Sequence, residues 1–266
     1  MIILLIIVLI ILIIFVNILI NDTDLLYSFK FIKNNYTPVE YRKRKILIIT
    51  AENRNTDYIR LHDSNFEKYT KLHNYEYLRL DNCEPSESST YWCKIFKVYS
   101  YLMTDKYDYV MWADSDTIIT DYSVDIDYYI SNFGEKDIII GIDEKSVWNI
   151  FFRYYILNAG LFLIKNSQIG KKFLKKCIDY INKNKEECIV NNKEQGRWSG
   201  LCYEQGYMNA LIKNKYSNNV YIDYSKTFIH NKTSYVKANF DYSGLFVHLA
   251  GFSNENREIF FKKFIN

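Results

Sequence analysis

The feature that most constrains this 266-residue chain is a short apolar segment that ends in two aspartates. Residues 109–112 read Tyr-Val-Met-Trp, a pattern typical of a β-strand buried on both faces. Asp114 and Asp116 follow at the expected carboxyl end of that strand, where open α/β sheets bind their ligands. Carboxylates next to an apolar strand need a cation or several hydrogen bonds to stay ionised. The segment therefore predicts a site for Mg²⁺ or Mn²⁺, with a solvated turn as the plainer alternative.

Strand and helix patterns alternate around this segment. Residues 46–49 and 75–80 have the apolar pattern of strands, and residues 58–73 and 91–103 carry apolar side chains at helical spacing. Such alternation is typical of an α/β fold, with a parallel sheet and helices on its faces. Further strands are predicted at 137–142, 161–164, 220–224 and 246–249, helices at 168–182, 204–213 and 254–266, and a loop at 183–199.

The N-terminus is almost unbroken Ile, Leu, Val and Phe. About 19 such residues can cross a bilayer as a helix, and no small-residue cleavage point of a signal peptide is visible. We therefore expect residues 1–20 to form a single-pass transmembrane anchor and residues 21–45 a polar tether. Residues 46–266 are then long enough for one domain with an ordinary core.

The sequence leaves the orientation of that anchor open. Basic residues follow the anchor, and the positive-inside rule then favours a cytoplasmic domain. Glycosylation sequons at Asn21, Asn35 and Asn231 favour the opposite side of the membrane. The five cysteines lie at irregular spacing and imply neither a zinc site nor a disulfide framework. The net charge of +3 is spread along the chain and gives no indication of nucleic acid.

Several polar residues elsewhere are candidates for chemistry. His248 ends an apolar strand, and it is either a hydrogen-bonded core histidine or a third metal ligand with the two aspartates. Lys94 is either a solvated lysine or a phosphate contact. The segment 158–160, Asn-Ala-Gly, allows the backbone to approach a sugar hydroxyl or marks a bulge. Glu204 and Gln205 open a predicted helix, where a carboxylate meets the helix dipole and one of the two groups could lie beside a reacting carbon.

Five motifs occur in a fixed order along the chain. They are Tyr91-Trp92-Cys93-Lys94, Trp112-Ala113-Asp114-Ser115-Asp116, Leu157-Asn158-Ala159-Gly160, Glu204-Gln205 and His248-Leu249-Ala250-Gly251. This order resembles glycosyltransferase family 34, which contains plant xyloglucan α-1,6-xylosyltransferases and fungal α-1,2-galactosyl- and α-1,6-mannosyltransferases. The likeness covers residues 46–252. It implies a GT-A fold, which is a Rossmann-like α/β sandwich of the nucleotide-diphospho-sugar transferases.

The resemblance also implies an activity and its partners. It points to a retaining glycosyltransferase that takes a hexose or pentose from UDP-galactose, UDP-xylose or GDP-mannose and transfers it to a glycan acceptor. The implied cofactor is Mn²⁺, with Mg²⁺ as the alternative. The anchor and tether match a type II membrane protein, located in the Golgi if the host is eukaryotic. A homodimer is left open.

The resemblance assigns roles to individual residues. Asp114, Asp116 and His248 match the metal ligands, and Gln205 matches the residue nearest the β face of the anomeric carbon. An amide is a poor nucleophile, which fits a front-face displacement better than a covalent intermediate. The donor-binding residues are expected to be Thr50, Ala51, Lys94, Ser115, Ala159, Gly160 and Gly251, besides the metal ligands, and the catalytic residues Gln205, Glu204 and Asn158.

The chain departs from the family pattern after the last motif. Ser253 stands where plant members have a lysine that contacts the diphosphate, and Phe252 replaces a cysteine. Arg257 or Lys94 could supply the missing charge. Two alternatives follow: a non-catalytic relative that binds a glycan or nucleotide, and a nucleotidyltransferase. The latter is disfavoured because residues 50–57 contain no Gly-rich basic loop.

Overall fold

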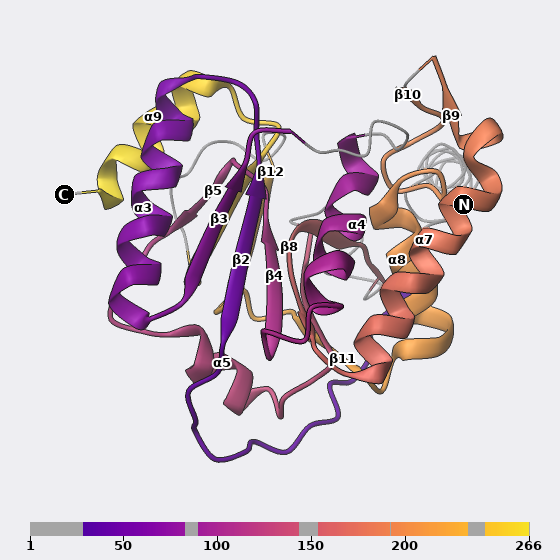
Figure 1. Ribbon diagram of the computed structural model, residues 1–266, viewed down its shortest axis with the longest axis horizontal. Coiled ribbons are helices and arrows are strands. Elements are labelled where there is room, and N and C mark those ends of the chain that lie inside the picture. The colour runs from indigo at the N-terminus through magenta and orange to yellow at the C-terminus, as the bar shows by residue number, and fades with distance from the viewer. Residues whose placement is uncertain (1–28, 83–89, 144–153, 192, 234–242, 266) are drawn as a thin grey trace, which may run out of the picture.

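A six-stranded sheet forms the centre of the protein (Figure 1). The computed structural model describes residues 29–82, 90–143, 154–191, 193–233 and 243–265. The strand order is β11-β6-β8-β4-β2-β3. The strands are β2 (Ile46–Ala51), β3 (Glu76–Leu80), β4 (Tyr109–Ala113), β6 (Ile138–Ile142), β8 (Leu157–Lys165) and β11 (Val220–Asp223). The predicted parallel pairing of β2 with β3 and β4 is confirmed, whereas β8 runs antiparallel to β4 and β6. The predicted α/β class is therefore confirmed, with a mixed sheet.

Helices cover both faces of this sheet. Successive strand residues point to opposite faces, so neighbouring residues of one strand pack into different cores. Leu47 and Ile49 pack into the core formed with α4 (Thr90–Leu102), α7 (Gln168–Cys188) and α8 (Glu204–Leu211). Ile46 and Ile48 pack towards α3 (Asp57–His73) and α5 (Ile126–Asn132). Strands buried on both faces read as continuous apolar runs, which explains the pattern in the sequence.

A second, three-stranded sheet brings the C-terminal part of the chain back to the aspartates. Its order is β12-β13-β5, with β5 (Thr117–Ile119), β12 (Ile229–Thr233) and β13 (Phe246–Ala250). In the antiparallel β13–β5 pair, His248 lies opposite Thr117, the residue that follows Asp116. Helix α9 (Asn254–Phe261) then packs against α3. Strand β12 and helix α5 were not predicted.

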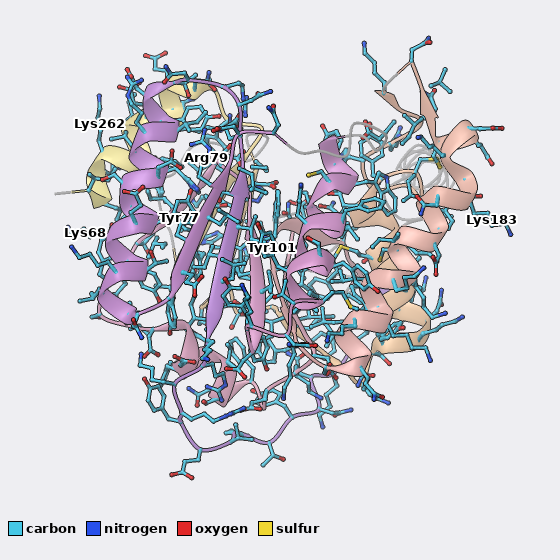
Figure 2. All side chains as sticks on the ribbon, in the orientation of Figure 1. Lys68, Tyr77, Arg79, Tyr101, Lys183 and Lys262 are labelled. Atoms are coloured by element: carbon cyan, nitrogen blue, oxygen red, sulfur yellow. A yellow bond between two sulfur atoms is a disulfide. The ribbon has the colours of Figure 1, made fainter. Side chains whose placement is uncertain are left out.

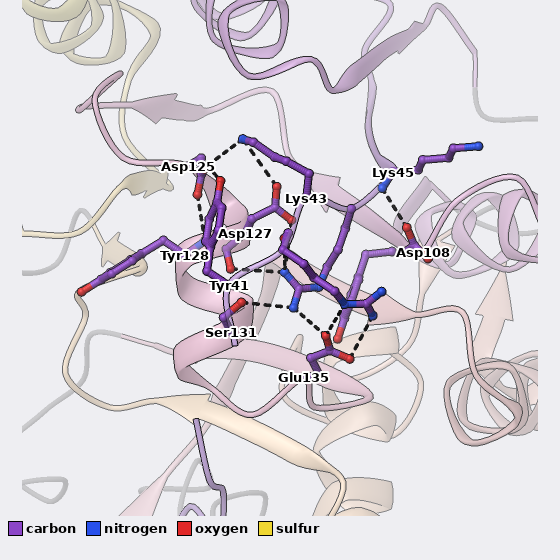
Figure 3. A network of polar contacts seen from close by, with 12 residues as sticks. Tyr41, Lys43, Lys45, Asp108, Asp125, Asp127, Tyr128, Ser131 and Glu135 are labelled. Carbon is purple, nitrogen blue, oxygen red and sulfur yellow. Dashed lines mark hydrogen bonds and ion pairs between the residues drawn. The ribbon is translucent and has the colours of Figure 1, made fainter. Parts of the chain in front are cut away.

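The described part of the expected tether, residues 29–45, packs on the domain. Its first strand, β1 (Phe29–Lys30), pairs with β7 (Tyr154–Tyr155). Asn34 exchanges two hydrogen bonds with the backbone of Ile222, of 2.9 and 3.0 Å. Arg44 then enters a buried network of ion pairs on α5, shown in Figure 3. The described part of this segment is therefore in contact with the domain along its length.

The predicted membrane anchor, residues 1–20, lies outside the described residues. Within the part of the chain that the structure describes, no helix is both long and apolar enough to cross a bilayer.

The segment predicted as a loop at 183–199 contains regular structure. Helix α7 continues to Cys188, and a hairpin of β9 (Ile189–Val190) and β10 (Lys193–Glu194) follows. A disulfide joins Cys188 to Cys202. The irregular spacing of the cysteines did not imply this pairing, because the two cysteines are brought together by the return of the chain to α7.

Candidate active site

Asp114, Asp116 and His248 meet beyond the carboxyl end of β4. One ligand atom from each lies within 4.8 Å of the others. The His248 Nε2 atom is 3.0 Å from Asp116 Oδ1 and 3.9 Å from Asp114 Oδ2. Two carboxylates and one imidazole form a donor set suited to Mn²⁺ or Mg²⁺. These three residues therefore fit a divalent metal ion, and the solvated-turn alternative does not hold for Asp116, which is largely buried.

The loop that carries the aspartates is fixed through its backbone. The Asp114 N–H donates to the carbonyl of Gly160 at 2.7 Å, and the Leu249 N–H donates to the carbonyl of Asp116 at 2.9 Å. Two of the three motifs that follow in the sequence, those on β8 and β13, therefore hold this loop directly.

Asn231 orients the candidate metal ligand His248. The Asn231 Oδ1 atom lies 3.0 Å from His248 Nδ1, and Asn231 Nδ2 donates to the Ile142 carbonyl at 2.9 Å. A proton on Nδ1 that points at this oxygen leaves Nε2 free for a metal. Asn231 is 0% exposed, so its sequon is not accessible in the folded protein. This role of Asn231 was not predicted, and the sequon was the only feature of the sequence that marked the residue.

Gly160 gives the His248 ring its space. A Cβ atom on Gly160 would lie only 2.1 Å from His248 Cε1 and 2.5 Å from Nδ1. Asn158, Ala159 and Gly160 lie inside β8 rather than in front of a strand. The register between β6 and β8 shifts here, because Ile140 pairs with Phe162 and Gly141 with Asn158, so the extra residues are on β8 and include Gly160. The Asn158 Oδ1 atom accepts a hydrogen bond from the Gly160 N–H at 2.8 Å. Residue 160 therefore has to be glycine, because any side chain would overlap the His248 ring.

Substitution of Gly160 with alanine should weaken metal binding. The added methyl group has to displace the imidazole, and changes around a ligating histidine typically cost 10–100-fold in metal affinity. We expect the affinity for Mn²⁺, measured by isothermal titration calorimetry, to fall by at least about tenfold. Gly196→Ala is a suitable control, because a Cβ there meets nothing within 4 Å although its φ is +83°. Equal Mn²⁺ affinities in the two variants would contradict this account of Gly160.

Each aspartate has a basic partner. Lys94 Nζ lies 3.0 Å from Asp114 Oδ1, 3.3 Å from Glu204 Oε1 and 3.2 Å from the Ala159 carbonyl oxygen. Burial disfavours the charged lysine, but the ion pairs with Asp114 and Glu204 outweigh it and raise the pKa of Lys94. Lys94 is 4% exposed, so the solvated-lysine alternative is wrong.

Arg257 is the partner of Asp116. The Arg257 Nη2 atom lies 2.7 Å from Asp116 Oδ2. His248 Nε2 lies 3.0 Å from the other carboxylate oxygen, Oδ1. Burial acts to raise the pKa of Asp116, but His248 and Arg257 outweigh burial and lower it to about 2. Asp116 is therefore ionised across the physiological pH range.

The first two residues of α8 present buried polar atoms without partners. Gln205 Oε1 accepts a hydrogen bond from the Ala159 N–H at 2.9 Å. Among the described residues, Gln205 Nε2 and Glu204 Oε2 are buried and have no hydrogen-bond partner. Burial raises the pKa of Glu204 against the opposing effect of Lys94. Such atoms cost about 1–3 kcal/mol each when unsatisfied, so they mark a place where a polar ligand would complete the bonding.

The residues expected to face the nucleoside lie at the end of β2. Thr50 is fully buried, and its hydroxyl donates to the Ala113 carbonyl at 2.9 Å. Ser115 donates instead to Glu52 Oε2 at 2.7 Å. Burial opposes ionisation of Glu52, but bonds from Arg54 and Ser115 lower its pKa to about 2. The nucleoside role of Thr50 and Ala51 remains a prediction.

A polar cleft of about 450 Å³ opens beside these residues, at the carboxyl ends of β2 and β3. Figure 2 shows Arg79, which lies on its wall, and Tyr77 on β3 next to α3. Glu52 also lines the cleft, so its bond to Ser115 connects the cleft to the aspartate loop. Glu52 was not among the residues predicted for the site. The lining residues are Glu52, Asn53, Arg54, Asn55, Ile59, Arg60, Asp63, Arg79, Asp81 and Asn82.

The end of the last motif forms a turn. Gly251 has a φ of +74°, which favours glycine. Ser253 caps α9, and its hydroxyl accepts a hydrogen bond from the Asn256 N–H at 3.3 Å. Ser253 therefore has a local structural role, as expected for serine at a helix N-cap.

Comparisons with known proteins identify the fold. No protein-family model matches the sequence, and no curated protein matches it. A glycosyltransferase involved in the glycosylation of the major capsid of PBCV-1 superposes with a TM-score of 0.58 at 16% identity, over 82% of this chain and 99% of that chain. GlyE of Streptococcus pneumoniae TIGR4 gives a TM-score of 0.46 at 17% identity, over 84% and 61%. A197 from STIV gives 0.37 at 13% identity, over 67% and 81%. The first of these similarities shows that the chain has the fold of a glycosyltransferase.

Proposed function

We propose that the protein is a metal-dependent glycosyltransferase that uses a nucleotide-diphosphate sugar and a glycan acceptor, and that it is related to glycosyltransferase family 34. The observation that carries the proposal is the convergence of Asp114, Asp116 and His248 within 4.8 Å, on a glycosyltransferase fold. The polar cleft next to this cluster suits the nucleoside, and the unpartnered atoms of Glu204 and Gln205 suit the hydroxyl groups of a sugar.

The arrangement supports separate roles for these residues in sugar transfer. Asp114, Asp116 and His248 would hold Mn²⁺ or Mg²⁺, which neutralises a diphosphate and helps it to leave. Gln205 is held by the Ala159 N–H, so its free amide N–H groups can orient the donor sugar. Because an amide is a poor nucleophile, we favour transfer with retention by front-face attack of the acceptor hydroxyl. The departing diphosphate is the group that the site has to stabilise most.

Arg257 is our candidate for the positive charge that Ser253 does not supply. An ammonium group has three N–H donors, and the three acceptors around Lys94 Nζ occupy them at 3.0–3.3 Å. A guanidinium has five donors, and only the bond from Arg257 to Asp116 is short, at 2.7 Å; its other contacts measure 3.4 Å. Arg257 therefore retains donors for a diphosphate next to the metal ligands.

Substitution of Arg257 with glutamine should weaken binding of a nucleoside diphosphate more than binding of the monophosphate. Hydrogen bonds to charged groups contribute about 1.5–3 kcal/mol, so the diphosphate affinity should fall roughly tenfold or more. Titration calorimetry with UDP against UMP, and GDP against GMP, measures this difference in the presence of Mn²⁺. Lys262→Gln is the control, because this exposed lysine near the end of α9 pairs with Glu258. An equal loss of affinity for the monophosphate and the diphosphate would mean that Arg257 only holds Asp116 and does not contact the diphosphate.

The decisive test of the function is nucleotide binding followed by transfer. The full chain, purified in detergent, is heated with UDP, GDP or their sugars, with and without Mn²⁺. A ligand at 100 times its Kd adds about 2.7 kcal/mol of stability, so binding gives a clear shift in Tm. A Mn²⁺-dependent shift together with transfer or hydrolysis of the donor supports the proposal. No shift from the folded protein contradicts it, and a shift without turnover supports the non-catalytic alternative.

A further inference from the structure

Two tyrosines stand beside the candidate sugar site at the start of two helices. Tyr91 lies in the first turn of α4 and is 48% exposed, and Tyr203 directly precedes α8 and is half-buried. Their rings meet edge to face, with centroids 5.1 Å apart. An exposed tyrosine pair of this kind offers apolar ring surface with polar hydroxyls, which is the mixed character that the face of a pyranose ring requires.

A carboxylate with a free oxygen completes this surface. Glu194 lies on β10 near the start of α4: burial raises the pKa of its carboxylate, and the Tyr91 backbone N–H opposes that rise. The Glu194 Oε1 atom is buried and has no hydrogen-bond partner among the residues that the structure describes. Since burial of an unsatisfied oxygen is unfavourable, Oε1 is suited to accept a bond from a ligand hydroxyl.

The surface is held firmly next to the charged residues of the site. Trp92 Nε1 donates to the Cys202 carbonyl at 2.9 Å, which ties the start of α4 to the segment before α8. The Cys188–Cys202 disulfide closes the segment that contains the β9–β10 hairpin. Figure 1 shows this hairpin above the starts of α4 and α8.

The position of the tyrosines separates them from the donor sugar site. Lys94 follows Tyr91 by one helical turn and Glu204 follows Tyr203 directly, and these two residues pair at 3.3 Å. Lys94 and Glu204 are only 4% and 3% exposed, whereas Tyr91 is 48% exposed. The tyrosines therefore lie nearer the protein surface than Lys94 and Glu204, at the N-terminal ends of the same two helices.

We propose that Tyr91, Tyr203 and Glu194 form a binding subsite for one pyranose ring of the acceptor glycan. The ring lies against the tyrosines, and one of its hydroxyl groups donates to Glu194 Oε1. The acceptor role of this sugar rests on the proposed transferase function, but binding of the pyranose does not require it.

Saturation-transfer NMR tests the subsite on the full chain. The probes are the methyl α- and β-pyranosides of glucose, galactose, mannose and xylose, each with and without Mn²⁺ and UDP or GDP. We expect saturation of at least one glycoside, unchanged by nucleotide, and a loss of at least fivefold in Tyr91→Ala and in Glu194→Gln. Tyr91→Phe keeps the ring and should keep the signal. Tyr128→Ala is the matched control, because Tyr128 on α5 is a 53% exposed tyrosine away from the site.

The outcomes separate this inference from the proposed function. Saturation of none of the glycosides, or an unchanged signal in Tyr91→Ala, overturns the subsite. Displacement of the glycoside by nucleotide with Mn²⁺ also overturns it, since the sugar then occupies the donor site. A persistent glycoside signal from a protein that shows no nucleotide shift would leave the subsite in place and contradict the transferase.

Discussion

Replacement of Asp116 with asparagine should abolish Mn²⁺-dependent nucleotide binding and lower sugar transfer by about 10³-fold, because a bound metal contributes several kcal/mol and each 1.36 kcal/mol is tenfold in rate. Asp116 Oδ1 lies 3.0 Å from His248 Nε2, and Oδ2 lies 2.7 Å from Arg257. The substitution removes the negative charge to which a cation and both neighbours are attracted. It leaves two positive or protonatable side chains facing each other across the site.

The comparison requires an aspartate outside the site. Asp121 follows β5, is exposed, and accepts hydrogen bonds from the N–H and hydroxyl of Ser123 at 2.8 and 2.6 Å. Asp121→Asn should therefore keep Mn²⁺ and nucleotide affinity at the level of the unaltered protein. The readouts are calorimetric titration of Mn²⁺ and the nucleotide-induced shift in Tm. If the Asp116 variant still bound nucleotide fully in a Mn²⁺-dependent manner, then Asp114, Asp116 and His248 would not be the metal site of the reaction.

The parts of the site that could be predicted are those with a local signal. The apolar run of β4 is continuous because the strand is buried on both faces, so the two aspartates were placed correctly at its carboxyl end. His248 was grouped with them through its motif, and the pairing of β13 with β5 accounts for their proximity. Gly160 was predicted as a site residue because it has no side chain. The His248 ring, which requires a glycine at this position, lies 88 positions further along the chain.

Other residues have no local signal because their partners are distant in the sequence. Asn231 contacts His248 across the parallel β12–β13 pair, and β12 was not predicted because it carries Asn, Lys and Thr instead of an apolar run. Glu52 reads as an ordinary loop carboxylate until the fold brings Ser115 to it, 63 residues away. The hairpin at 189–194 likewise lies between two cysteines that a disulfide joins, a long-range link that a polar sequence does not reveal.

The position of segment 29–45 could also not be predicted from its own sequence, because its partners are distant along the chain. Its polar and basic composition is typical of a solvated tether, and nothing in its own pattern indicates burial. Arg44 is nevertheless fully buried at its side chain, because residues 83 and 91 positions later, Asp127 and Glu135, accept its hydrogen bonds. Long-range ion pairs thus hold Arg44 against the domain.

Substitution of Arg44 with methionine should therefore destabilise the domain by about 3–5 kcal/mol, the usual cost of removing one partner from a buried ion pair. Arg44 Nη1 lies 3.3 Å from Asp127 Oδ1, and Nη2 lies 2.5 Å from Glu135 Oε1 and 3.1 Å from Ser131 Oγ (Figure 3). The Asp127 side chain is 0% exposed, so the loss leaves a buried carboxylate with weaker compensation. For a domain of this size the expected fall in Tm is roughly 6–20 °C.

Arg42 provides the matched comparison, because it pairs with the same Glu135 carboxylate at 2.9 Å from a side chain that is 56% exposed. Exposed ion pairs contribute about 0–1 kcal/mol, so Arg42→Met should change the free energy of unfolding by less than about 1 kcal/mol. Urea unfolding of both variants, followed by circular dichroism, measures the two differences. A large loss for Arg44 alone means that residues 29–45 are held to α5 by a buried contact. Equal, small losses would mean that this segment can detach, as a tether would, without unfolding the sheet that carries the site.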